Sequence, residues 1–391
     1  MTRIIYAAQP VDTAPGTPFA GADVKVIDGL LINTPEYAAK HAARVAALAE
    51  QAALHSAAMA RHAPGTREHD EARYNLWMCQ RFAGISGTAA GTVIGVNKWQ
   101  TPFAYWQEAT FRVHAGNVSN PAMEWGQRKE PVVAQKYCDA HNCYLKVPET
   151  FTSPLFPFMT ASPDRIVLAP DGSESRILEI KCTGFNRSIR NDLGVIVDQD
   201  WGPGNQDGMT DSAIPVQYIA QVMHYMLATG IYTADVAVLI GHDDYREYTI
   251  ELDAEQAEDL IRAEDEFYCR NILDDVRPAD MTASDWGKVK PVKSSAVEAT
   301  PEMLELARDL ANITSQIKVL EAREKTLRDA LIGFIGEKEG MLYDGAPVAT
   351  YAGRERAGSF DSKKLSIDHP ELYEKYKGEK TFYRVFSLKL K

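Results

Sequence analysis

The strongest constraint on the fold of this chain is a pair of apolar segments joined by a tight turn. Residues 150–168 and 175–183 are rich in β-branched and aromatic residues, and the turn sequence Pro170-Asp171-Gly172 lies between them. This pattern predicts a β-hairpin. The runs Ile166-Val167-Leu168 and Ile177-Leu178 indicate that both strands are buried. Charged residues near the ends of buried strands are rare, because burying an unpaired charge is costly, so they indicate a specific role.

Three charged residues lie near one end of this predicted hairpin. Glu179 and Lys181 share one face of a strand and Ile180 faces the other, because strand side chains alternate. Antiparallel pairing would bring Asp164 to the same edge. The two carboxylates and the Ile180 carbonyl then form an oxygen-only site suited to Mg²⁺ or Mn²⁺. Lys181 could orient or deprotonate a water, or neutralise charge on a phosphate; the alternative is a solvated strand face.

Two predicted helices carry further polar candidates. Glu124 and Glu130 are six residues apart on a helix over 124–142, so they face differently and only one is expected to reach the metal site. Gln217, Gln221 and His224 follow the i, i+4, i+7 spacing of one helix face. These three either form buried hydrogen bonds or line the active site.

A glycine- and hydroxyl-rich turn suggests a phosphate site. Arg81 precedes the turn over 84–88, which leads into a predicted helix at 89–95. Backbone N–H groups at a helix start, with a hydroxyl and an arginine nearby, suit an anion. An ordinary N-cap by Ser86 or Thr88 is the alternative for the turn alone.

The charge of the chain limits how it could bind a polyanion. The formal net charge is −12, which argues against coating nucleic acid by bulk electrostatics. Residues 301–391 are nearly balanced, so residues 1–300 carry 26 basic against 39 acidic side chains. A polyanion site there must be a small basic island, and Lys181, Arg187 and Arg190 supply one.

The order of predicted elements indicates a mixed α/β (α+β) fold with helices flanking a central sheet. Helices are expected at 34–62, 215–229 and 254–274, strands at 234–240 and 245–252, and a long loop at 184–213. Leucine, isoleucine and phenylalanine residues between 306 and 334 recur at four- and three-residue spacings, which predicts a coiled-coil-like helix packed on its own chain or on another subunit. We divide the chain into an N-terminal extension with an Ala-rich helix (1–73), a catalytic domain (74–276), a linker (277–300), and a helix with a small β tail (301–391).

Cysteine usage and the termini indicate an intracellular protein. The five cysteines, at 79, 138, 143, 182 and 269, are widely spaced with no C-x-x-C pair, so neither an iron–sulfur cluster nor a zinc site is expected. The N-terminus lacks a signal-peptide layout and no segment has the length and apolarity of a membrane span. We therefore expect a cytoplasmic protein with no nucleotide cofactor.

Several motifs occur in a specific order. They are R-x-x-x-I-x-G-[ST] at 81–88, W-G-x-x-x-E at 125–130, Ser162-Pro163-Asp164, Glu179-Ile180-Lys181, Trp201-Gly202, and the segment 214–230. In this combination the chain resembles, over residues 74–275, the YqaJ-like viral recombinase family. That family comprises relatives of phage lambda exonuclease within the PD-(D/E)xK nuclease superfamily.

The resemblance implies a restriction-endonuclease-like core that degrades linear double-stranded DNA from 5′ ends. It further implies Asp164, Glu179 and the Ile180 carbonyl as ligands of two metal ions, with Lys181 as the catalytic lysine. Glu130 would be the helix acid near the second metal, and Gln221 would position the water or the lysine. Phosphate would be held by three residues, Arg81, Thr88 and Ser162.

The resemblance also implies a biological setting. The 3′ overhangs would serve a single-strand annealing protein in recombination encoded by a phage or prophage within a bacterial host, and a homo-oligomeric ring is possible. Two alternatives stay open: a structure- or site-specific endonuclease on the same core, and a non-catalytic protein that binds DNA ends. Loss of Asp164, Glu179 or Lys181 would be expected of the latter, and all three are present.

Overall fold

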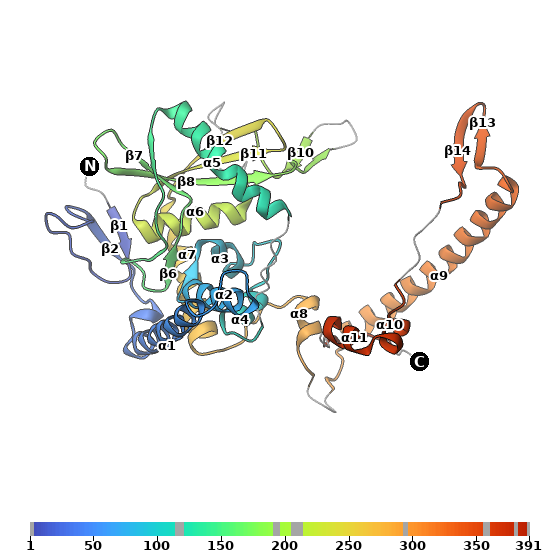
Figure 1. Cartoon of the computed structure of the whole chain (residues 1–391), viewed down its shortest axis with the longest axis horizontal. Coiled ribbons are helices and arrows are strands. Elements are labelled where there is room, and N and C mark those ends of the chain that lie inside the picture. The colour runs from blue at the N-terminus through green and yellow to red at the C-terminus, as the bar shows by residue number, and fades with distance from the viewer. Residues whose placement is uncertain are drawn as a thin grey trace. The chain divides into compact units, whose positions relative to one another are not determined.

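A five-stranded sheet forms the centre of the computed structural model of this chain (Figure 1). Its strands lie in the order β12-β11-β8-β7-β4. Strands β8 and β11 pair in parallel and the other neighbours pair antiparallel, so the sheet is mixed, as predicted. The strands span β4 Tyr144–Lys146, β7 Arg165–Leu168, β8 Glu174–Thr183, β11 Thr233–Ile240 and β12 Asp244–Glu251.

The structure describes residues 4–113, 121–190, 196–204, 214–291, 296–354, 360–378 and 382–388. The chain divides into two compact units, Met1–Thr282 and Ala283–Lys391. The central sheet and every predicted site residue belong to the first unit.

Two helices cover opposite faces of the central sheet. Helix α5 (Pro121–His141) lies along the sheet (Figure 1). It buries Val133, Ala134 and Tyr137 against Leu178, Ile180 and Ala237 of β8 and β11. Helix α6 (Val216–Thr229) packs on the other face, which receives the alternate side chains of β8. Strand alternation therefore directs Glu179 and Lys181 toward α6.

Residues 150–168 differ from the single strand predicted there. They form three short strands, β5 (Phe151–Thr152), β6 (Met159–Ala161) and β7, and only β7 joins the central sheet. Strand β6 pairs in parallel with β3 (Ile85–Ser86) in a second sheet. Pro154 and Pro157 interrupt the segment, which explains the break because proline cannot donate to a strand ladder.

Other predicted boundaries shift by a few residues or change type. The expected loop over 184–213 contains the antiparallel strands β9 (Ser188–Arg190) and β10 (Ile196–Gln199); residues 191–195 and 205–213 lie outside the described residues. The predicted helix over 254–274 is α7 (Ala254–Glu266) continued by a π-helix, η3 (Phe267–Leu273). The remaining elements of the first unit are β1 Ile4–Ala7, β2 Asp23–Val26, η1 Leu31–Asn33, α1 Pro35–Met59, α2 Arg67–Arg81, α3 Gly87–Val93 and α4 Pro102–Ala109.

Polar contacts tie the N-terminal segment to the helices that follow the sheet. The Asp265 carboxylate, 3% exposed, accepts hydrogen bonds from the backbone N–H groups of Leu31 (2.6 Å) and Ile32 (3.0 Å). Asp274 accepts from the Tyr37 hydroxyl and the Lys40 ammonium, each at 2.6 Å. Removing residues 1–40 would therefore leave the buried Asp265 carboxylate without its two backbone donors.

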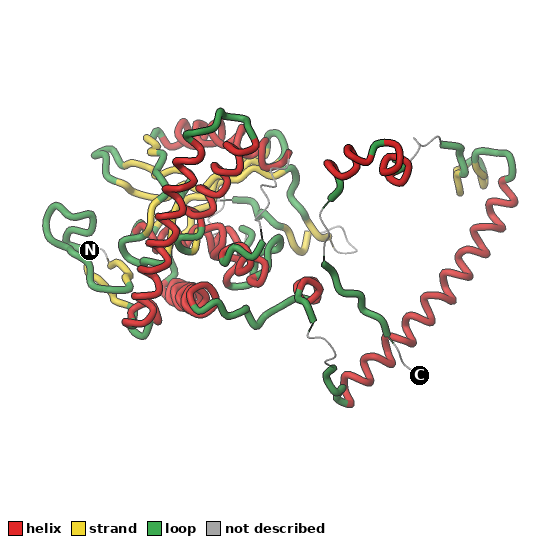
Figure 2. Tube along the Cα trace, turned by 60° about the horizontal axis from the view of Figure 1, so that its bottom comes forward, coloured by secondary structure: helices red, strands yellow, loops and turns green. Residues whose placement is uncertain are grey.

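The second unit is built around a long helix. Helix α9 (Pro301–Ile335) leads into the hairpin of β13 (Gly340–Tyr343) and β14 (Ala346–Thr350), as Figure 2 shows. Its apolar seam is exposed, with Leu306 at 59% and Leu320 at 63%. The short helices of this unit are α8 Ala283–Lys288, within the expected linker, α10 Ser362–Asp368 and α11 Pro370–Tyr376. Among the described residues of either unit, no helix combines the length and apolarity needed to cross a membrane.

A buried ion pair joins α6 to α7. His224 and Glu264 are both 0% exposed, and the His224 Nδ1 lies 2.9 Å from each Glu264 carboxylate oxygen. The His224 Nε2 lies 3.0 Å from the Thr160 carbonyl oxygen, which can only accept, so Nε2 carries a proton. Burial lowers the pKa of His224, but the Glu264 charge and these hydrogen bonds outweigh it and raise that pKa. His224 is thus a structural residue, one of the two alternatives for its helix face.

We expect Glu264→Gln to lower the free energy of unfolding by about 3–5 kcal/mol at pH 6, because it leaves a buried imidazolium without its counter-ion. The contribution of the pair is fully present below the unfolded-state pKa of histidine and is lost as pH rises through the higher folded-state pKa. Urea denaturation at pH 6 and pH 9 measures the difference, with the exposed His62→Ala as control. If the loss of unfolding free energy in Glu264→Gln is as large at pH 9 as at pH 6, the ion pair is contradicted.

Candidate active site

The predicted carboxylates meet at one edge of the sheet. Asp164 directly precedes β7, and antiparallel pairing of Arg165 with Leu178 brings it beside the middle of β8. The Ile180 N–H donates a hydrogen bond of 2.7 Å to Asp164 Oδ2. The arrangement expected from the hairpin is therefore present, with Asp164 next to Glu179 and Ile180.

Glu179, Lys181 and Gln221 form a closely packed cluster between β8 and α6. Glu179 is 2% exposed, and its Oε1 accepts from Lys181 Nζ (2.6 Å) and Gln221 Nε2 (2.7 Å). Lys181 Nζ also donates to Gln221 Oε1 at 3.2 Å. Gln221, also buried, thus contacts both charged residues and fixes their geometry.

One oxygen of this cluster lacks a partner within the described part of the chain. Glu179 Oε2 is buried and makes no hydrogen bond to any residue that the structure describes. A buried carboxylate oxygen without a donor is costly, and a cation relieves that cost. The free oxygen of Glu179, the adjacent Asp164 and the main-chain carbonyl of Ile180 offer the hard oxygen ligands that Mg²⁺ and Mn²⁺ prefer. The residues present therefore fit a divalent cation.

The electrostatics of the site favour a bound cation. Burial and the charge of Glu179 raise the pKa of Asp164 to about 7, against the opposing effects of Lys181 and the Ile180 N–H. Burial lowers the pKa of Lys181, but the charges of Glu179 and Asp164 outweigh it and raise that pKa. Lys181 therefore places a positive charge and a hydrogen-bond donor next to the two carboxylates.

Glu130 rather than Glu124 lies toward the site. The Glu130 carboxylate accepts from Arg165 NH1 at 2.7 Å, and the same guanidinium donates to the Asp164 carbonyl oxygen at 2.5 Å. Glu124 instead pairs with Arg128 on the exposed side of α5. Within the described part of the chain, no three His, Cys, Asp or Glu side chains gather closely enough to hold a metal by themselves. Glu130 is thus connected to Asp164 indirectly, through the Arg165 guanidinium.

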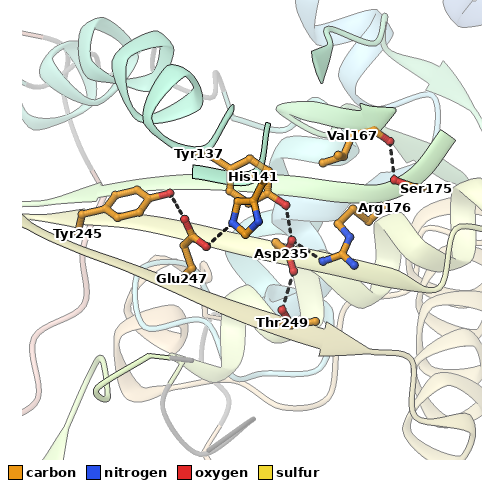
Figure 3. Close-up of polar contacts among 9 residues, drawn as sticks. All are labelled: Tyr137, His141, Val167, Ser175, Arg176, Asp235, Tyr245, Glu247 and Thr249. Carbon is orange, nitrogen blue, oxygen red and sulfur yellow. Dashed lines mark hydrogen bonds and ion pairs between the residues drawn. The ribbon is translucent and has the colours of Figure 1, made fainter. Parts of the chain in front are cut away.

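A polar network on the opposite face of the sheet holds α5 in place (Figure 3). Asp235 of β11, 3% exposed, accepts from the Tyr137 hydroxyl of α5, from Arg176 NH1 (2.7 Å) and from Thr249 Oγ1 (2.7 Å). Nearby, Glu247 lies 2.6 Å from His141 Nε2 at the end of α5. This network positions the helix that carries Glu130.

The proposed phosphate residues form a separate group near α3. Arg81 NH2 donates to Thr88 Oγ1 at 3.4 Å, and its guanidinium lies 5.1 Å from the centroid of the Trp77 ring. Ser162 accepts from Thr150 at 3.1 Å. Because β3 and β6 are parallel, Thr88 and Ser162 follow their strands at the same end of that sheet.

Tyr225 links the proposed phosphate-binding residues to the catalytic cluster. The Tyr225 hydroxyl lies 3.3 Å from Gln221 Nε2, and its ring fills the space next to Gly87, where a side chain would overlap it.

Arg187 pairs with Asp200 at 3.3 Å, whereas the Arg190 side chain lies outside the described residues.

Two side chains of this site were not predicted from the sequence. Arg165 bridges Glu130 and Asp164, and its position in a buried strand was the available signal. The ring of Tyr218 lies 4.8 Å from Lys181 Nζ, a cation–π contact that depends on how α6 docks on β8. No spacing rule within one element predicts that contact.

Comparison with known proteins identifies related chains. Residues 76–232 match the family model described as the YqaJ-like viral recombinase domain. The chain is 28% identical over 339 residues to the uncharacterized protein YqaJ of Bacillus subtilis (strain 168), which covers 82% of this chain and 96% of that protein. The predicted resemblance to this family is confirmed.

Two solved structures match about half of this chain. A crystal structure of an alkaline exonuclease from Laribacter hongkongensis matches with a TM-score of 0.37 and 19% identity, over 51% of this chain and 92% of that one. A phage related exonuclease from Haemophilus somnus 129PT matches with a TM-score of 0.33 and 14% identity, over 49% and 94% of the two chains.

We expect Asp164→Asn to raise the thermal stability of the cation-free protein at pH 8. The raised pKa of Asp164 means that its ionisation destabilises the fold as pH rises from about 4 to about 7, so the neutral amide gains most above pH 7. The gain is on the order of 1–3 kcal/mol, or several degrees in Tm.

Differential scanning calorimetry in EDTA at pH 4 and pH 8 measures this effect. Asp171→Asn is the matched control, because the pKa of Asp171 is lowered by its hydrogen bonds to Ser173 and its ionisation carries no such cost. A variant Asp164→Asn that is less stable than wild type at pH 8 would refute the electrostatic account.

Proposed function

We propose that this chain, with its YqaJ-like viral recombinase domain, is a divalent-metal-dependent deoxyribonuclease. The observation that carries the proposal is the unpaired, buried oxygen of Glu179 beside Asp164 and within a cluster that also holds Lys181 and Gln221.

Each residue of the cluster has a separate task in phosphodiester hydrolysis. Asp164, Glu179 and the Ile180 carbonyl would hold Mg²⁺ or Mn²⁺, one or two ions, which would lower the pKa of a water and stabilise the leaving oxygen. Lys181 donates to the scissile phosphate and offsets its developing charge. Gln221 holds Lys181 and one oxygen of Glu179, which leaves the other oxygen of Glu179 for the cation.

The finer proposal is 5′→3′ digestion of linear double-stranded DNA to leave 3′ overhangs. Arg81, Thr88 and Ser162 supply a guanidinium and hydroxyls suited to a terminal phosphate, joined to the catalytic cluster through Tyr225. A single-strand annealing protein would use the overhangs. The exposed apolar residues of α9 support self-association of the chain.

The test of catalysis uses linear duplex DNA and a covalently closed circle with Mg²⁺. We expect digestion of the linear DNA only, reduced by at least about 10²-fold in Glu179→Gln and Lys181→Met. Glu124→Gln, an exposed carboxylate on α5, should keep wild-type activity. Titration calorimetry with Mn²⁺ should show binding to wild type that Glu179→Gln loses.

Different outcomes separate the alternatives. Cutting of the closed circle that depends on Glu179 would replace the exonuclease with an endonuclease on the same residues. Binding of DNA ends without hydrolysis by wild type in Mg²⁺ or Mn²⁺ would refute the enzyme and leave a DNA-end-binding protein.

The phosphate site predicts a dependence on the 5′ group. Wild type should digest 5′-phosphorylated DNA with a higher kcat/KM than 5′-hydroxyl DNA, and Arg81→Ala should lose about 10-fold on the phosphorylated end only, the worth of a charge-assisted hydrogen bond. Arg73→Ala, on the exposed side of the same helix, should affect both ends alike. Equal losses of activity on both kinds of end in Arg81→Ala would show that Arg81 does not recognise the 5′ phosphate.

A further inference from the structure

We propose that a pocket next to Lys181 receives an unstacked nucleobase of the strand being hydrolysed; this inference rests on the proposed nuclease function. The pocket has a volume of about 380 Å³, within the range of small-molecule sites. Its lining includes Lys98, Trp99, Phe185, Arg187, Trp201 and Tyr218. Four aromatic rings and two cations are the chemistry that binds a nucleotide.

The back wall of the pocket is built from packed aromatic rings. Trp201, 3% exposed, stacks on Tyr218 with ring centroids 5.5 Å apart and planes at 22°. Its backbone is fixed by Asn186, whose side chain accepts from the Trp201 N–H (2.9 Å) and donates to the Trp201 carbonyl (2.6 Å). The partly exposed ring of Tyr218 is therefore held in place by Trp201 before a base arrives, which lowers the cost of binding.

Two further aromatic rings of the pocket are exposed among the described residues. Trp99 is 72% exposed and Phe185 is 73% exposed, and Trp99 lies 6.4 Å from Tyr218 between ring centroids. Exposed large rings gathered at one pocket, rather than scattered, mark a binding surface. Stacking of a base between these rings and the back wall would bury them.

The polar groups of the pocket match the rest of a nucleotide. Gln217 is 7% exposed, and its buried Oε1 has no hydrogen-bond partner among the described residues. Each nucleobase presents an N–H donor on its edge that this oxygen can accept. Lys98 and Arg187 both approach Asp200 Oδ1, at 3.1 and 3.3 Å, so two cations already converge at the pocket and can take up a phosphate.

The pocket and the catalytic cluster share a wall. The Tyr218 ring contacts both Lys181 of the catalytic cluster and Trp201 of the pocket. Gln217 of the pocket lies one helical turn before Gln221 on α6. A nucleotide whose phosphate reaches Lys181 therefore has its base within reach of the pocket. A stacked, paired base could not enter it, so the pocket selects a strand that is frayed or unpaired at the cleavage point.

Two linear duplexes test the inference, identical except that one has abasic tetrahydrofuran residues at the two terminal nucleotides of each strand. Wild type should favour the base-bearing end by about 5- to 100-fold in kcat/KM, the worth of stacking one base. Trp99→Ala should lose this preference and Trp99→Phe should keep most of it. Tyr144→Ala, an equally exposed ring on the outer strand β4, should keep it fully.

A binding measurement decides the pocket independently of hydrolysis. In Ca²⁺, titration calorimetry should show a deoxynucleoside 5′-monophosphate binding at least about 10-fold more tightly than deoxyribose 5-phosphate, and Trp99→Ala should abolish the difference. Equal affinities would overturn the base pocket whether or not the protein cleaves DNA. Equal cleavage of both duplexes by wild type would also overturn it and leave the nuclease standing, whereas no cleavage of any DNA would overturn the nuclease and leave this titration to decide the pocket.

Discussion

The burial of Glu179 is the constraint on which the rest of the site depends. A carboxylate that is 2% exposed on a central strand is tolerated only with partners. Lys181 and Gln221 donate to one of its oxygens, while the other has no partner among the residues that the structure describes. Strand alternation on β8 then requires α6 to bring Gln221 to that face. The fold thus assembles a site that is electrostatically incomplete by itself, and a cation is the simplest group that completes it.

The two faces of the sheet have different roles, one carrying the catalytic carboxylates and the other the network that holds α5. On the α6 face the charges of Asp164 and Glu179 oppose each other, and the pKa of Asp164 rises to about 7. On the α5 face, Asp235 receives three donors from three elements. A fully satisfied network can hold α5, and with it Glu130, against the repulsion of the site, because buried polar groups stabilise a fold only when their partners are complete.

Sequence periodicity was enough to predict the hairpin, the mixed sheet and the clustering of Asp164, Glu179 and Lys181, since these follow from local alternation and one turn. It was not enough for residues 150–168, because the partner of a short strand such as β6 is chosen by tertiary contacts with β3. The choice between Glu124 and Glu130 also depended on the docking of α5, through Arg165. Tyr218 and Trp201, seventeen residues apart, are joined only by the packing of α6.

The net charge of −12 explains why such a pocket would be useful to a nuclease of this kind. An acidic surface repels duplex DNA beyond the immediate basic side chains, so affinity cannot come from many phosphate contacts. Base stacking is insensitive to that repulsion and tolerates any sequence. Aromatic rings next to Lys181 would therefore hold the reacting nucleotide where it is needed, while the acidic surface discourages binding elsewhere along the duplex. The combination favours DNA ends and unpaired positions, where a base is free to leave the stack.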